Sequence, residues 1–342
     1  MTPEGIDPEG LQGWFEANVP GVAPPLEYER IAGGQSNLTY RVTDSAGRRF
    51  ALRRPPLGRA LASAHDMGRE HRAISALQDT PVPVPPVFGL CEDEGVNGAP
   101  FFVMGFVDGV VVRSEEEAAA AFDERQRHAV GERLVDTLVA IHEVDPDAVG
   151  LGTLGKKEDY VARQLRRWGG QWEKSKTREL PLVEDLGRRL SARIPEQGPA
   201  TIVHGDYRID NVLLDPDSCD VAAVLDWELC TLGDPLADIG LLLVYWSEPG
   251  EEGGLRQATA APGFPRRAEL RDRYAAGSGR DLSEVDFYVA LGYWKLAIVI
   301  EGVYARYAAG QYGPDAREQF EPLRTMVEGL ARAGDEAERR LR

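Results

Sequence analysis

Apolar residues form short runs over the first third of the chain and recur at helical spacing over most of the rest. A helix is expected over residues 8–19, because Asp7 can cap its first turn and Pro8 suits the first helical position. Apolar residues every three or four positions predict another helix over residues 61–77. Short apolar runs between glycine-rich or polar turns predict strands, the first three of them antiparallel. These runs cover residues 28–32, 38–42, 50–52, 87–90 and 101–107.

The remainder of the chain is predicted to be mainly helical, with one passage rich in strands. A helix is marked by apolar residues from 130 to 141, and the strand-rich passage covers residues 201–225. Further helical patterns cover residues 235–246, 266–276, 284–307 and 314–333. We therefore expect an α+β chain with a small sheet-containing lobe at residues 1–107 and a larger helical lobe at residues 108–342.

Charge and composition exclude several classes of protein. The chain has 342 residues, with 56 acidic and 39 basic side chains and a formal net charge of −17. This leaves no basic excess for binding duplex nucleic acid or an acidic membrane surface. Its three widely spaced cysteines indicate neither a disulfide framework nor a zinc site. The start lacks a signal-peptide pattern, and the apolar stretch 239–246 is too short to span a membrane, so a cytoplasmic protein is expected.

Three polar residues in the strand-rich passage have the chemistry that phosphoryl transfer requires. Asp206 can accept the proton of an acceptor hydroxyl, while the amide oxygen of Asn211 can bind a metal ion. Asp226, at the end of a later apolar strand, offers the charged oxygen that Mg²⁺ prefers. Asp and Asn also form ordinary turns, but their place between strands favours the functional interpretation. His204, beside the catalytic Asp, is expected to have a structural hydrogen-bonding role.

In these motifs and in several others, the chain resembles the aminoglycoside phosphotransferase and choline kinase superfamily. It is most similar to the kinase-like domains that occur alone in bacteria or fused to acyl-CoA dehydrogenases. The similar segments are residues 33–40, 52–56, 64–70, 98–104, 204–211 and 224–238. The resemblance extends over about residues 27–310 and implies a bilobal protein-kinase-like fold. It also implies that residues 204–211 form the catalytic loop, that ATP or GTP is the phosphate donor, and that Mg²⁺ is required.

The turn between the first two strands resembles the phosphate-covering flap of that family. It contains Gly33, Gly34, Gln35, Ser36 and Asn37, whose backbone amides can approach a phosphate closely. A Gly-Gly pair also forms ordinary hairpins, so this motif alone is weak. The segment lacks the Gly-Lys-Ser/Thr ending of a P-loop, so a P-loop nucleotide fold is not supported.

Other residues of the small lobe are candidates for holding the nucleotide. Arg53 occupies the place where the resemblance implies a phosphate-binding Lys, and Glu70 would be its ion-pair partner. Arg can bind phosphate, but its planar fork differs from the point charge of Lys. The alternative for Glu70 is a solvated helix face. Met104 and Phe106 mark the linker expected to contact the adenine ring, although their side chains can also be core.

Three acidic residues follow Asp226 closely. Glu228 is a candidate for supporting the metal ligand or binding a second metal ion. Asp234 and Asp238 are expected to tie the catalytic loop to the following helix, since capping is the common role of such residues.

A basic segment at residues 159–178 is the candidate acceptor site. Arg163, Arg166 and Arg167 share one helical face beside Trp168, so they can bind an anionic acceptor such as a phosphate-bearing CoA thioester. The resemblance to domains fused to acyl-CoA dehydrogenases implies that this thioester is a hydroxyacyl-CoA. The alternative is a solvated basic helix in an acidic protein. A polycationic aminoglycoside would prefer an acidic pocket.

Two classes of function are compatible with these motifs. The first is an ATP- and Mg²⁺-dependent kinase of a small hydroxyl compound, with a hydroxyacyl-CoA, an aminoglycoside or another alcohol as acceptor. The second is a degenerate nucleotide-binding module, for which Arg53 in place of Lys is the main argument. No activation segment ending in Ala-Pro-Glu follows Asp226, which argues against a protein kinase. The oligomeric state is not predicted.

Overall fold

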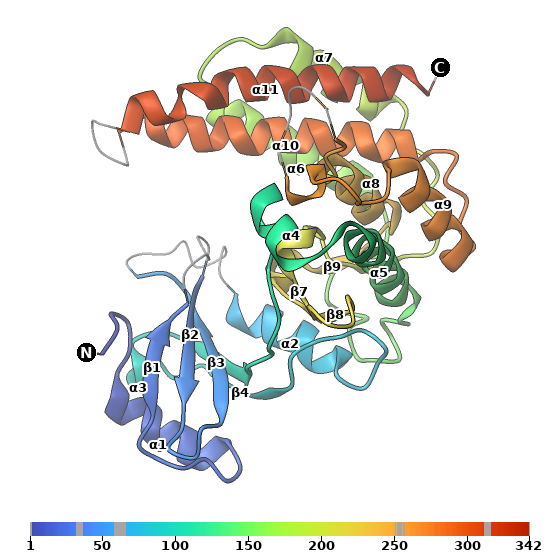
Figure 1. The fold of residues 1–342 in the computed structure, drawn as a ribbon. Coiled ribbons are helices and arrows are strands. Elements are labelled where there is room, and N and C mark those ends of the chain that lie inside the picture. The colour runs from blue at the N-terminus through green and yellow to red at the C-terminus, as the bar shows by residue number, and fades with distance from the viewer. Residues whose placement is uncertain are drawn as a thin grey trace.

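The chain folds into a small lobe built on one sheet and a larger helical lobe (Figure 1). The computed structural model describes residues 2–31, 37–57, 66–249, 251, 255, 257–310 and 316–341, with the backbone alone for residues 316–319. The five strands of the small lobe are all antiparallel, in the order β1-β2-β3-β5-β4. They are β1 (Glu27–Arg30), β2 (Leu38–Thr43), β3 (Arg49–Arg54), β4 (Val87–Cys91) and β5 (Phe101–Gly105). The five predicted strands are confirmed.

The two faces of this sheet pack against different helices. The helices are α1 (Pro8–Asn18), α2 (Met67–Leu77) and α3 (Glu94–Asn97). Phe50 and Leu52 of β3 join the apolar cluster that contains residues of α1. Ala51 joins the cluster that contains residues of α2, and the alternation of a strand places Arg53 on the same face. The sequence therefore directs one arginine of β3 toward α2.

The caps of the two longer helices match their sequences. Asp7 accepts hydrogen bonds from the amides of Glu9 and Gly10, which confirms the predicted start of α1. α2 begins at Met67, and the Asp66 side chain accepts a hydrogen bond from the amide of Arg69. The predicted helix started at residue 61, but residues 58–65 lie outside the described part of the chain.

The larger lobe contains eight helices in the part of the chain that the structure describes. They are α4 (Glu115–Ala121), α5 (Glu124–Glu143), α6 (Tyr160–Ser175), α7 (Pro181–Ala192), α8 (Leu236–Tyr245), α9 (Arg267–Ser278), α10 (Val285–Ala308) and α11 (Ala316–Arg339). The predicted helices near 130–141, 235–246, 266–276, 284–307 and 314–333 are confirmed, with longer bounds for α5 and α11. Helix α7 was not predicted, although Pro181 suits its first turn and Val183, Leu186 and Leu190 recur on its buried face.

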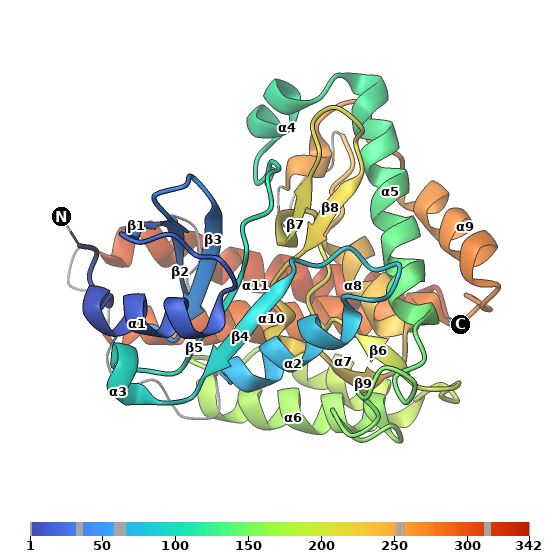
Figure 2. The ribbon, with the colours of Figure 1, turned by 90° about the horizontal axis from the view of Figure 1, so that it is seen from below.

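α10 is the central helix of this lobe. It packs against α6, α7, α8 and α11, and it lies alongside α11 in both ribbon views (Figures 1 and 2). With 24 residues and a mean hydropathy of 1.3 it is long and apolar enough to cross a membrane, but 61% of its most apolar window is buried in the protein. It is therefore accounted for as a core helix. This helix was not singled out from the sequence as long and apolar, because polar residues interrupt its apolar runs.

Two short strand pairs place the loops of interest next to each other. β6 (Thr201–Val203) pairs with β9 (Thr231–Gly233), and β7 (Val212–Leu214) pairs with β8 (Val221–Val224). Residues 204–211 connect β6 to β7, while residues 225–230 connect β8 to β9. The backbones of these two loops are joined by a hydrogen bond of 2.9 Å from the Leu225 amide to the Asn211 carbonyl.

The connection between the lobes follows β5. The Phe106 amide still donates to the Arg49 carbonyl of the small lobe, whereas Val110 pairs with Leu214 of the large lobe. We propose that the lobes divide within residues 106–109. A second crossing links the Val224 amide to the Pro83 carbonyl at 2.8 Å, so the loop after β8 faces the small lobe.

Candidate active site

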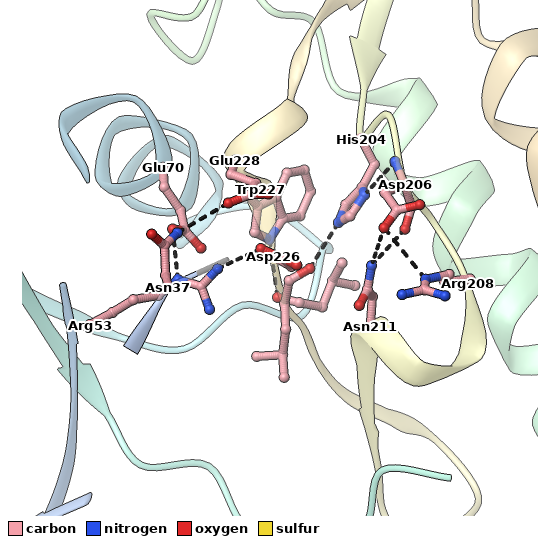
Figure 3. Close-up of polar contacts among 12 residues, drawn as sticks. Asn37, Arg53, Glu70, His204, Asp206, Arg208, Asn211, Asp226, Trp227 and Glu228 are labelled. Carbon is pink, nitrogen blue, oxygen red and sulfur yellow. Dashed lines mark hydrogen bonds and ion pairs between the residues drawn. The ribbon is translucent and has the colours of Figure 1, made fainter. Parts of the chain in front are cut away.

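Asp206 lies among polar side chains from two parts of the large lobe, the loop 204–211 and helix α8. The Asn211 side-chain amide donates to its carboxylate at 3.0 Å, and the Arg208 guanidinium lies 3.4 Å away (Figure 3). Tyr245, at the end of α8, lies within the range of the Asp206 charge. Burial and this neighbouring negative charge raise the pKa of Tyr245, so the phenol stays protonated. The Asp206 carboxylate is thus fixed in position and still partly exposed, with 23% of its side chain accessible.

The backbone of residues 204–211, the predicted catalytic loop, is held by a buried carboxylate of α8. Asp238 accepts from the amides of His204 at 2.6 Å and Gly205 at 2.9 Å, and it also contacts His142. Burial opposes ionisation of Asp238, but its contacts with the two histidines and the Gly205 amide hold its pKa below the usual range. The predicted tie between the loop and the following helix is confirmed for Asp238. Asp234 instead accepts from the Leu236 amide and the Tyr288 hydroxyl.

His204 has the structural role that the sequence predicted. Its ring is fully buried, and Nε2 lies 2.9 Å from the Leu225 carbonyl. The amide of Asp206 donates to Nδ1 at 3.3 Å. The imidazole therefore joins the catalytic loop to the loop after β8, and both of its nitrogens are engaged.

Asn211 and Asp226 offer oxygen ligands from these two adjacent loops. The Asn211 amide nitrogen donates to Asp206, which leaves its oxygen for another partner. Asp226 has a positive φ of 64° and an accessible side chain, 28% exposed. No cluster of three His, Cys, Asp or Glu residues suited to a metal ion occurs in the described segments. The pair fits Mg²⁺, which typically takes one or two protein oxygens and completes its shell with phosphates and water.

Arg53 lies between the two lobes and contacts a carboxylate on each side. Its Nε donates to Glu70 of α2 at 2.8 Å, and a second nitrogen lies 2.5 Å from Asp226 (Figure 3). The structure therefore brings together Arg53 and Glu70, the pair named from the sequence, and adds Asp226. Burial raises the pKa of Glu70 to about 6, with Arg53 opposing the shift and Asp226 adding to it. Glu70 is buried, unlike the solvated helix face considered as the alternative.

The structure describes only part of the expected nucleotide-binding set. Gly33, Gly34, Gln35 and Ser36 lie outside the described residues. The Asn37 amide donates to Glu228 at 3.1 Å, which links the end of the flap to the loop after β8 (Figure 3).

The linker residues named for the adenine ring lie at the end of the sheet. Met104 is buried in β5 between β3 and β4. Phe106 is half-buried beneath the Arg49 guanidinium, 5.0 Å from its ring centre, and its amide is already bonded to the Arg49 carbonyl. Contact with an adenine ring stays a prediction for both residues.

The three arginines of α6 have different surroundings. Arg163 donates to the Lys156 carbonyl and lies over the Tyr160 ring. Arg166 is exposed. Arg167 lies 5.5 Å from the Trp168 ring centre, on the side of α6 that packs near α10. Arg167 also acts through its charge on Lys295 of α10.

Three residues beside Asp206 were not predicted from the sequence. Arg208 pairs with Asp206 at 3.4 Å and with Asp210 at 3.1 Å, and Tyr245 lies within the range of the Asp206 charge. Lys295 of α10 donates to the Gly205 carbonyl at 3.0 Å. A signal for Lys295 existed, because it is the only lysine in a long apolar helix. Tyr245 gave none, since it ends an apolar run that is equally typical of core.

Comparison with known proteins supports a kinase-like assignment. A model of the phosphotransferase enzyme family matches residues 27–288. The chain is 35% identical over 312 residues to acyl-CoA dehydrogenase family member 10 of Mus musculus, covering 90% of the chain and 29% of that protein. It is 31% identical over 328 residues to family member 11 of Gallus gallus, covering 93% of the chain and 41% of that protein. The chain therefore spans less than half the length of these curated relatives.

Solved structures give the same result for the fold. A Ralstonia eutropha protein, provisionally described as an aminoglycoside phosphotransferase, is 34% identical with a TM-score of 0.82, covering 97% of this chain and 99% of that one. Choline kinase from Cryptosporidium parvum, at 13% identity, shares the fold alone, with a TM-score of 0.67 over 98% of this chain and 96% of that one. The bilobal kinase-like fold expected from the sequence is confirmed. From the extent of the family match and of these likenesses, the chain belongs to the phosphotransferase enzyme family.

Proposed function

We propose that this chain transfers the γ-phosphate of ATP to a hydroxyl group of a small molecule, with Mg²⁺ required. The observation that carries the proposal is the placement of Asp206, Asn211 and Asp226 on two loops joined by a backbone hydrogen bond. This is the equipment that phosphoryl transfer needs: a carboxylate at the acceptor hydroxyl and oxygen ligands for the metal ion. Family membership supports the same interpretation.

The chain's own residues supply positioning and charge. Asp206 accepts the hydroxyl proton as the acceptor oxygen bonds to the γ-phosphorus and the bond to the β-phosphate oxygen breaks, which releases ADP. Asn211 holds this carboxylate in place. Asn211 and Asp226 would hold Mg²⁺, whose charge offsets that of the phosphates. Arg53 would turn from Asp226 toward the phosphates once the metal neutralises that carboxylate.

For the acceptor, we propose a hydroxyacyl-CoA. The relatives above are longer than this chain and are named acyl-CoA dehydrogenase family members. Their name supports an acyl-CoA thioester as the substrate of this chain. The basic face of α6 would suit the phosphates of such a molecule. We also propose a cytoplasmic location, in keeping with three free, buried cysteines.

Phosphorus NMR of the products tests the transfer directly. The protein is incubated with ATP, Mg²⁺ and, in turn, a hydroxyacyl-CoA, an aminoglycoside and choline. We expect a new phosphoester signal with the hydroxyacyl-CoA that is absent for Asp206→Asn. A phosphoester only with the aminoglycoside or choline would overturn the acceptor class. ATP binding without any phosphoester would instead favour the degenerate nucleotide-binding module.

A further inference from the structure

Lys295 is a cation placed in an otherwise apolar part of α10, next to the reacting carboxylate. Most residues of α10 from Val285 to Ile298 are buried. Withdrawing an ammonium group from water is costly unless it has partners. Lys295 has three donors, and within the part of the chain that the structure describes its one hydrogen bond is to the Gly205 carbonyl, at 3.0 Å. Gly205 directly precedes Asp206.

Two carboxylates and one guanidinium act on the Lys295 ammonium. Burial lowers the pKa of Lys295. The carboxylates of Asp206 and Asp238 oppose this shift, whereas the nearby Arg167 adds to it. Asp238 is occupied by two loop amides and His142. Among the described residues, therefore, no close ion pair neutralises the positive charge of Lys295.

Lys295 also lines a narrow pocket between α6, α8, α10 and the catalytic loop. Trp168, Leu241 and Leu291 form its apolar walls, and Gly205 lies at the catalytic end. Its cavity volume of about 30 Å³ has room for one small group. This pocket suits one slender end of a molecule and excludes a bulky amino sugar.

A second cation borders the same wall. The Arg167 guanidinium and the Lys295 ammonium each lie 5.5 Å from the centre of the Trp168 ring. The two residues belong to helices separated by more than a hundred positions in the chain, so the fold alone brings them together. The charge of Arg167 acts on Lys295, whose pKa it lowers, and a bound anion would offset both positive charges.

We propose that Lys295, with Arg167 beside it, binds an anionic oxygen group of the acceptor, a carboxylate or a phosphate, and so selects anionic hydroxy compounds. This inference rests on the proposed kinase function and adds the charge of its substrate. The anionic group would occupy the pocket while the hydroxyl of the same molecule meets Asp206. A cationic acceptor would meet the Lys295 ammonium at this point and be disfavoured, because the Asp238 carboxylate in the same lining is already held by two loop amides and His142.

Four matched probes separate charge from size: 3-hydroxypropanoate, 3-hydroxypropyl phosphate, 1,3-propanediol and 3-amino-1-propanol. Their dissociation constants are measured by proton NMR with the full chain in the presence of ADP and Mg²⁺. We expect the wild type to bind at least one anionic probe about tenfold or more tightly than the diol, and the amino alcohol most weakly. The two anionic probes distinguish a carboxylate from a phosphate site.

Variants then assign the preference to Lys295. In Lys295→Met the affinities for the anionic probes and for the diol should differ by no more than about twofold. Lys295→Arg should keep most of the preference for the anionic probes. Lys174→Met is the matched control, because it removes the same charge from an exposed position of α6. If Lys295→Met does not fold, Arg167→Glu, at an exposed position, should reverse the ranking toward the amino alcohol.

Two results would overturn the inference: equal binding of all four probes by the wild type, or an equal loss for all four in Lys295→Met. The second result would mean that Lys295 only positions Gly205. Phosphate transfer is followed separately by phosphorus NMR. A charge preference without transfer from ATP to any acceptor would contradict the kinase proposal instead, so the two failures are distinguishable.

Discussion

At the scale of single residues, the site is notable for the cations gathered around one carboxylate. Asp206 has Arg208 at 3.4 Å, and Lys295 lies within the range of its charge. These cations lie beside the carboxylate that we propose accepts the hydroxyl proton. They also place positive charge where the transferred phosphoryl group carries negative charge.

We predict that Asp206→Asn lowers turnover by roughly 10² to 10⁴-fold and leaves ATP affinity within about twofold of the wild type. The amide keeps the size of the side chain but cannot take the proton. Steady-state kinetics and calorimetric titration of ATP measure the two quantities. Asp217→Asn, an exposed aspartate of the β7–β8 hairpin, is the matched control. Full turnover by Asp206→Asn would remove this residue from the mechanism.

Arg53 lies where the resemblance implied a phosphate-binding Lys, and its loss should destabilise the fold. In Arg53→Met, Glu70 would be left buried without its counterion, so we expect the free energy of unfolding to fall by about 3–5 kcal/mol at pH 7. Chemical denaturation measures it. Arg41→Met, which removes an exposed ion pair with Glu29, is the control and should cost less than about 1 kcal/mol.

The same pair gives a pH dependence with a definite sign. Burial raises the pKa of folded Glu70 to about 6 from its ordinary 4.5, so the folded state holds this proton more tightly than the unfolded state. Its contribution to stability is therefore largest below pH 4.5 and is lost as the pH rises through 6. The loss should be steeper in Arg53→Met, where nothing offsets the buried charge. Denaturation at about pH 5 and about pH 7 compares the two proteins, and parallel pH profiles would contradict this prediction.

At the scale of elements, the close approach of α8 and α10 sets the position of both Asp238 and Lys295. Gly240 makes this approach possible, because an added Cβ would lie 2.6 Å from the Cβ of Tyr288 and 2.8 Å from its backbone. These contacts involve the start of a side chain and the main chain, so they cannot be relieved by a rotamer change.

We predict that Gly240→Ala destabilises the protein by about 1–3 kcal/mol and raises the KM for the acceptor, because the two helices must move apart. Gly329→Ala is the control. An added Cβ at Gly329, in α11, meets nothing within 4 Å, so this change should stabilise the helix by about 0.5–1 kcal/mol. Denaturant unfolding of both variants is the measurement. Equal effects of the two changes would show that the helices tolerate separation.

At the scale of the whole molecule, polar contacts of Asp226 and its neighbours join the lobes. Arg53 reaches Asp226 from the sheet, and Arg69 of α2 donates twice to the Cys230 carbonyl, at 2.9 and 2.6 Å. Both contacts end on the loop after β8. A nucleotide bound between Arg53 and Asp226 would therefore act on the same contacts that set the arrangement of the lobes.

We predict that ATP with Mg²⁺ at about a hundred times its dissociation constant stabilises the wild type by about 2.7 kcal/mol. Asp226→Asn should lose the part of this gain that depends on Mg²⁺, because an amide is a weaker metal ligand than a carboxylate. Thermal unfolding with ATP, in Mg²⁺ or in EDTA, measures the difference within each protein. If the Mg²⁺-dependent gain is unchanged in the variant, Glu228 becomes the candidate metal ligand.

Local sequence signals were enough to locate the elements and the central motif of the site. Apolar periodicity located most helices and all five strands of the sheet, because burial of one face repeats along the chain with the period of the element. Asp206 and Asn211 could be named because they lie five residues apart on one loop. Signals of this kind need no knowledge of distant parts of the chain.

The distant side chains that surround this motif could be identified only from the packed fold. Tyr245 and Lys295 lie in segments whose apolar pattern is typical of core. The single lysine of α10 is a local signal, but nothing in the sequence near it shows that it donates to the Gly205 carbonyl. The second contact of Arg53, with Asp226, spans 173 positions and depends on how the two lobes meet. Such contacts follow from the packing of α8 on α10 and of the sheet on the helical lobe. Packing is a property of the whole chain, so the charges that would select the acceptor became visible only in the fold.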